Sequence, residues 1–145
     1  MTAQATITQA QADAILKAAF AHQAQAGLKP LAVAVLDGGG RLVAFSRQDG
    51  AAPGRFDIAR GTAYGAVMLG MPGRAQMARA EAQAYFIAAA NGAFAGGLVP
   101  VPGGVLIQDA EGRTLGAVGI SGDASDADEA AALAGIEAAG LTAVP

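Results

Sequence analysis

The chain has 145 residues, which predicts a single domain over residues 1–145, and only 14% of them are charged, a low fraction for a soluble protein. It contains no cysteine, which excludes disulfides, thiolate nucleophiles and cysteine metal sites. The formal net charge is -3, so the chain lacks the basic surface that nucleic-acid binding requires, and no nucleic-acid partner is expected.

The first predicted element is a helix that starts at Thr8. Thr8 and Gln11 have the spacing of a capping box, and apolar residues recur at helical intervals after them. Gly27 and Pro30 end this helix. No basic region followed by an apolar run precedes it, so no signal peptide is predicted and the cytoplasm is the expected location.

This helix carries His22, the chain's one histidine, on the flank of its apolar side. A boundary histidine with one ring nitrogen in water is one interpretation. The other is an axial haem ligand, because a partly buried neutral imidazole among alanines leaves room for a flat macrocycle. The spacing does not decide between them. A single histidine does exclude paired-histidine sites, and no metal ion site is predicted.

The next elements are two strands, expected as a hairpin over residues 31–47. The first strand, "LAVAVL", is apolar on both faces, which predicts an interior strand covered on each side. Its turn, "DGGGR", resembles a phosphate loop in glycine content, but the strand "RLVAF" follows where such a loop requires a helix. The sequence therefore favours a turn.

The same Asp-x-x-Gly-Arg pattern recurs in "IQDAEGRTLGAV", inside a second hairpin expected over residues 105–121. In each copy an aspartate at the start of the turn can accept backbone N–H groups, and the last glycine can take a positive φ. We therefore expect Asp37 and Asp109 to cap their turns, with Gly40 and Gly112 at positive φ.

Between the hairpins the sequence predicts two helices, near residues 57–71 and 74–90, and a last helix begins near Ser125. The expected order is helix, two strands, two helices, about three strands, helix. Hairpins with helices grouped between them predict an antiparallel sheet in an α+β fold.

Residues 82–108 carry no charge, a pattern that raises the possibility of a membrane span. Five glycines and two prolines within residues 86–107 make one spanning helix unfavourable, and we expect no membrane association.

Two segments suggest ligand contacts. Pro102, Gly103 and Gly104 lead directly into a strand, either as an irregular strand entry or as backbone that a ligand approaches closely. Arg47 and Asp49 follow the first hairpin; such a pair lies at the surface, or the arginine holds a ligand carboxylate through two hydrogen bonds.

Acidic residues surround the start of the last helix: Asp123, Asp126, Asp128 and Glu129. They interact favourably with the helix N-terminal dipole on one interpretation. On another they form a hard-cation site or supply a general base. Asp128 and Glu129 are then the candidate catalytic residues.

Several segments resemble, in order, the successive blocks of the GlcG/HbpS family: "VAVLDGGGRLVAFSRQDGA", "DIARGTA", "VPGGVLI" and "LGAVGISGDASDADEAAALAGI". The resemblance spans about residues 8–139. It implies a five-stranded antiparallel sheet flanked by helices, similar to profilin-like folds, and frequent assembly into oligomers. The family's usual lysine in the "DIA" helix falls at Thr62 here, which leaves Arg60 as the nearby cation that stands in for it.

Two functions follow from this resemblance and these residues. The first is haem or tetrapyrrole binding by a cytoplasmic homo-oligomer, with His22 as the axial ligand. The second is a cofactor-independent enzyme for a small anionic metabolite, with a pocket of Pro102, Gly103 and Gly104. Arg47 would then hold the anion, and Asp128 or Glu129 would be the base.

Overall fold

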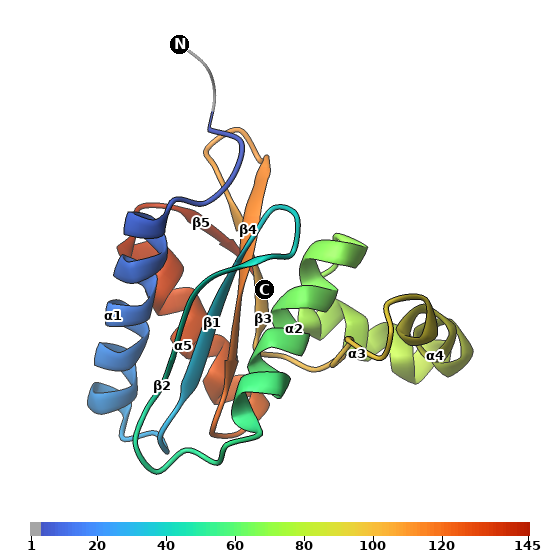
Figure 1. Ribbon diagram of the computed structural model, residues 1–145, viewed down its shortest axis with the longest axis horizontal. Helices are drawn as coiled ribbons and strands as arrows, with labels where there is room; N and C mark the ends of the chain where they lie inside the picture. Colours follow the sequence, from blue (N-terminus) through green and yellow to red (C-terminus); the bar gives the residue numbers. More distant parts are fainter. Residues whose placement is uncertain (1–3) are drawn as a thin grey trace.

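A computed structural model, which describes residues 4–145, shows a five-stranded antiparallel sheet with helices on both faces (Figure 1). The strand order is β2-β1-β4-β3-β5, which confirms the α+β prediction. β1 lies between β2 and β4, with Val33 opposite Ser46 on one side and Ile120 on the other, so the first strand is interior as expected. The elements are, in chain order, α1 (Gln9–Ala26), β1 (Ala32–Asp37), β2 (Leu42–Arg47), α2 (Arg55–Leu69), α3 (Gly73–Ala82), α4 (Ala84–Ala93), β3 (Gly104–Gln108), β4 (Thr114–Ser121), α5 (Ser125–Ala138) and β5 (Thr142–Val144).

Two features of this order differ from the prediction. The helix expected over residues 74–90 is divided into α3 and α4 at Gln83, whose φ of -144° and ψ of 70° are not helical. The strand expected before the last helix is instead β5, which follows α5 and pairs with β3. Apolar periodicity continues across Gln83, and β5 has only three residues, so neither feature has a clear signal in the sequence.

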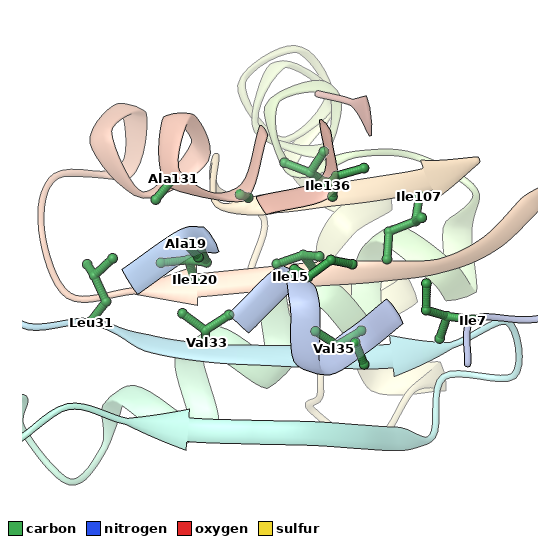
Figure 2. Packing of buried hydrophobic residues seen from close by; sticks show 14 of the residues in the cluster. Ile7, Ile15, Ala19, Leu31, Val33, Val35, Ile107, Ile120, Ala131 and Ile136 are labelled. Atoms are coloured by element: carbon green, nitrogen blue, oxygen red, sulfur yellow. The ribbon is translucent and has the colours of Figure 1, made fainter. Parts of the chain in front are cut away.

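α1 and α5 cover one face of the sheet, which carries branched side chains. Val33, Val35 and Ile120 lie beneath Ile15, Ala19 and Ile136 in this cluster, as Figure 2 shows. Each of these six residues is at most 1% exposed. Their burial is the main source of stability on this face, at about 25 cal/mol for each Å² of apolar surface removed from water.

α2 covers the opposite face, which is rich in alanine and glycine and also carries Leu36 and Leu106. Ala32 and Ala34 of β1 contact Ala59 of α2 there. A Cβ atom on Gly119 would overlap the carbonyl oxygen of Ala59, and one on Gly104 would overlap that of Thr62. The backbone of α2 therefore lies directly against β3 and β4, at a separation that larger residues do not permit.

Both Asp-x-x-Gly-Arg segments are hairpin turns, which confirms the prediction. Gly40 and Gly112 have φ values of 78° and 82°. Oδ1 of Asp37 accepts the N–H groups of Gly39 and Arg41, each at 2.9 Å. Asp109 accepts from its own turn in the same way, from Glu111 and Arg113 at 2.9 Å each.

Gly112→Ala should lower the free energy of unfolding by about 1–2 kcal/mol, because an L side chain is unfavourable at its φ of 82°. No atom lies within 4 Å of the added Cβ, so steric contact does not contribute. Urea unfolding measures the effect. The control is Gly54→Ala, at a φ of -69° and also without a neighbour within 4 Å, which should change stability by less than about 0.5 kcal/mol. Equal effects of the two substitutions would contradict the role of φ.

Candidate functional site

A polar cluster lies at the end of the sheet where β4 ends and α5 begins, and its most buried carboxylate is Asp128. This residue is 4% exposed, and its Oδ1 accepts the N–H of Asp123 at 2.9 Å. The N–H of Gly122 also donates to the carboxylate. Burial raises the pKa of Asp128 from 3.8 to about 6, although these hydrogen bonds and the charge of Arg55 lower it. A carboxyl group with this pKa can exchange a proton near neutral pH.

The polar cluster also contains Arg55 and Ser121, which the sequence did not identify as candidate site residues. Nη1 of Arg55 donates to Oγ of Ser121 at 2.9 Å, and Ser121 is only 2% exposed. Arg55 opens α2 and Ser121 ends β4, so the two are 66 positions apart and meet only because α2 packs on β4. Neither residue belongs to a local motif that identifies it. Together with Asp128 they place a cation, a hydroxyl and a carboxyl group at one end of the sheet.

Pro102, Gly103 and Gly104 are all buried beside this cluster. A Cβ atom on Gly103, whose φ is 124°, would lie 2.7 Å from the carbonyl oxygen of Ile120 and 3.8 Å from Cβ of Asp128. The carbonyl oxygen of Gly103 accepts the N–H of Ile120 at 3.0 Å. The structure therefore brings this segment next to Asp128, and its glycines permit close packing against α2 and β4.

Glu129, the second candidate base, forms an ion pair. Its carboxylate accepts from Nε and Nη2 of Arg74, at 3.2 Å and 3.0 Å, and the same arginine donates to Asp126 at 2.6 Å. Glu129 and Asp126 raise the pKa of Arg74 further above its usual range. Arg74 belongs to α3, so this network connects α3 to the start of α5. Glu129 is thus engaged in an ion pair, whereas no arginine or lysine pairs with Asp128 in the described part of the chain.

Asp123 connects the same loop to the residues that follow α1. Its Oδ2 accepts the N–H of Lys29 at 2.8 Å, and its Oδ1 accepts the N–H of Ala124 at 2.7 Å. These two bonds, the Lys29 bond first, lower the pKa of Asp123. The acidic group is therefore used in several ways: Asp123 and Asp128 accept backbone N–H groups, and Asp126 and Glu129 pair with Arg74.

Arg47 and Asp49 lie at the surface, at the end of β2 and in the loop after it. Nη1 of Arg47 donates to the carbonyl oxygen of Ala51 at 2.7 Å, and no ion pair joins Arg47 to Asp49 among the described residues. The remaining donors of this guanidinium group are available to an external anion.

Arg60 does not replace the lysine that the family resemblance implies at the position of Thr62. Thr62 is fully buried, with its hydroxyl donating to the carbonyl oxygen of Ala59 at 2.8 Å. Arg60 is half-buried, and its guanidinium carbon lies 5.2 Å from the centre of the Tyr64 ring. Residues two apart on a helix point in different directions, so Arg60 presents its charge away from the position of Thr62, at which the family resemblance implies a lysine.

His22 lies on α1, on the face of the sheet opposite α2, and is half-buried. Within residues 4–145 its ring takes part in no hydrogen bond or ion pair, so both ring nitrogens are free.

Residues 4–145 contain no group of three acidic or histidine residues that could hold a metal ion, and no pocket. No helix there has the length and hydropathy needed to cross a bilayer.

The structure is that of a small α+β protein, with an open antiparallel sheet covered by α2 on one face and by α1 and α5 on the other. A polar cluster lies at one end of this sheet. Residues 7–137 match the family described as "Haem degrading protein HbpS-like". The chain therefore belongs to the HbpS-like family. A comparison with curated proteins finds no match.

Solved structures share this fold over nearly the whole chain. The PduOC:haem complex is 20% identical with a TM-score of 0.84, covering 97% of this chain and 99% of that one. Klebsiella pneumoniae protein ORFY is 21% identical with a TM-score of 0.83, covering 97% of this chain and 94% of that one. A double mutant of Streptomyces reticuli HbpS is 28% identical with a TM-score of 0.78, covering 94% and 89%.

The raised pKa of Asp128 should make stability depend on pH in a defined direction. Between its unfolded pKa of 3.8 and its folded pKa of about 6, the folded protein binds more protons than the unfolded chain. The free energy of unfolding should therefore fall as the pH rises through this window, by at most about 3 kcal/mol from this group.

Asp128→Asn should remove this fall, because the amide oxygen still accepts the backbone N–H groups but carries no charge. Urea unfolding at a series of pH values between about 4 and about 7 measures the difference. The control is Asp49→Asn, at an exposed position, which should keep the slope of the parent. A parent-like slope in Asp128→Asn would mean that Asp128 titrates as an exposed carboxyl group does.

Proposed function

We propose that this protein binds haem or a related tetrapyrrole and that His22 is an axial ligand of the iron. The family description and the haem complex among the similar structures support haem as the ligand. One observation of this structure carries the assignment to His22: a half-buried imidazole whose two nitrogens have no partner within residues 4–145. Self-association and a cytoplasmic location are part of the same proposal.

The surroundings of His22 fit this role. Ala18 and Ala26 lie four residues before and after it, and Ala19 lies three residues before it, so three of the four neighbouring positions on this side of α1 carry small side chains. A neutral imidazole is a strong ligand for haem iron, and His22 is the only one that the sequence offers. When bound, haem would supply an iron centre with axial positions for protein ligands. The protein's contribution is to hold the half-buried imidazole on helix α1.

His22→Ala should weaken haem binding at least tenfold or abolish the low-spin absorbance spectrum, because it removes the only imidazole. A haemin titration that follows the Soret band measures both effects. Asp13→Asn, at an exposed position on the opposite side of the same helix, is the control and should bind as the parent does. A parent without a Soret shift at micromolar concentration would contradict haem binding, and parent-like spectra from His22→Ala would contradict the ligand assignment.

A second candidate function is suggested by Asp128, a nearly buried carboxyl group with a raised pKa beside the Gly103 backbone. Such a group is suited to general acid–base catalysis near neutral pH. In this function the protein is a cofactor-independent enzyme for a small anionic metabolite. Arg47 would hold the anion through the guanidinium donors that Ala51 leaves free, and Asp128 would be the base in preference to the paired Glu129.

Arg47→Ala should then weaken the binding of a small carboxylate by about tenfold or more, because a charge-assisted pair of hydrogen bonds is lost. Calorimetric titrations with acetate, succinate and citrate measure this. Arg41→Ala, at another exposed arginine next to β2, is the control and should leave binding unchanged. If none of the three acids binds below millimolar concentration, or if the two variants behave alike, Arg47 does not hold such an anion.

A further inference from the structure

Two arginines lie at the end of the sheet where α2 begins, and the pairing of three strands places the first of them. Arg47 of β2 pairs with Ala32 of β1, and Ala32 pairs with Ser121 of β4, so these residues form one row across the sheet. Paired residues of an antiparallel sheet point to the same face. Ala32 contacts Ala59 of α2, so Arg47 and Ser121 also face α2.

The second arginine, Arg55, is the first residue of α2 and reaches the same row. Its Nη1 donates to Oγ of Ser121 at 2.9 Å. The next residue, Phe56, packs edge-to-face on Phe45 of β2, with ring centres 4.6 Å apart. Phe45 lies two positions before Arg47 and therefore on the same face of β2. The start of α2 thus extends from β4 to β2 and brings both arginines to this end of the sheet.

Neither arginine is paired with a carboxylate. All four ion pairs within residues 4–145 belong to two other arginines. Asp49 and Asp57 each lie two positions along the chain from Arg47 and Arg55 respectively, but both aspartates are exposed and neither forms an ion pair in this part of the chain. Two unpaired guanidinium groups on one face of a sheet favour a negatively charged ligand.

Each arginine also keeps most of its hydrogen-bond donors, because a guanidinium group has five N–H groups. Arg55 uses one of them on Ser121, and Arg47 uses one on the carbonyl oxygen of Ala51 at 2.7 Å. Adjacent strands are about 4.8 Å apart, so the backbones of Arg47 and Ser121, two strands apart, are separated by roughly 10 Å. A ligand with an anionic group at each end fits this separation better than a compact anion does.

We propose that Arg47 and Arg55 together bind a small dicarboxylate, with one carboxylate at each guanidinium group. A guanidinium group holds a carboxylate through two parallel hydrogen bonds, which suits it to this task. Residues 4–145 enclose no pocket, which favours a short ligand held by its charged ends. The charge of Arg55 also acts on Asp128, so one end of the ligand would lie near the candidate base. This inference rests on the second candidate function and specifies its ligand.

Arg55→Gln tests the proposal, because glutamine can still donate to Ser121 but carries no charge. In calorimetric titrations the parent should bind succinate at least about tenfold more tightly than acetate or inorganic phosphate, since neither of these spans both arginines. Arg55→Gln should weaken succinate binding to about the level of acetate. The control is Arg41→Gln, which removes the same charge at the opposite end of β2 and should bind succinate as the parent does. Parent-like binding by Arg55→Gln, or a parent that binds the three anions equally, would overturn the proposal.

Amide chemical shifts give a second readout that does not depend on the folding of a variant. Succinate added to the isotope-labelled parent should shift the N–H signals of both Ala51 and Ser121, which contact the two guanidinium groups, and leave those of α1 unchanged.

The same titration separates this proposal from the function on which it rests. Shifts at Ala51 without shifts at Ser121 would overturn the dicarboxylate site but leave Arg47 as the anion-binding residue of the second candidate function. Shifts at neither residue, together with no calorimetric binding of succinate, acetate or phosphate, would overturn both.

Discussion

The close packing of α2 on an alanine and glycine face of the sheet is the contact on which the rest of the structure depends. Gly104 and Gly119 have no room for a Cβ atom, because the carbonyl oxygens of Thr62 and Ala59 occupy that space. The other face carries valine and isoleucine and accepts α1 and α5 at ordinary distances. This asymmetry brings the start of α2 against the end of β4, and so places Arg55 on Ser121.

The polar cluster at this end of the sheet combines structural and chemical roles. Asp123 and Asp128 satisfy backbone N–H groups in the loop between β4 and α5, which would otherwise be left without partners. Asp128 does so from a nearly buried position, so its charged form is disfavoured. Arg74 joins Glu129 and Asp126 to α3 and so links α3 to the start of α5.

The proposed functions use different sides of the molecule. His22 lies on α1, over the branched face of the sheet, whereas Asp128 lies at the sheet end where β4 ends and α5 begins. This separation means that a substitution at one of these places does not contact the other, and their effects on stability should be nearly additive.

Features that depend on neighbouring residues in the chain can be predicted from the sequence. Asp37 and Asp109 accept N–H groups two and four residues ahead, so the Asp-x-x-Gly-Arg pattern alone predicts both turns. The Thr8 capping box and the apolar period after it likewise predict the start of α1. The resemblance to the GlcG/HbpS family, also a property of the sequence, gave the five-stranded antiparallel sheet.

The tertiary structure decided which distant residues meet. The pairing of Arg55 with Ser121 and the burial of Asp128 arise where segments far apart in the chain are packed together. The division of the expected helix at Gln83 and the pairing of β5 with β3 also lack a local pattern. Burial and long-range contact depend on the whole packed chain, whereas turn and cap hydrogen bonds depend on a few consecutive residues, and only the latter can be predicted from a short stretch of sequence.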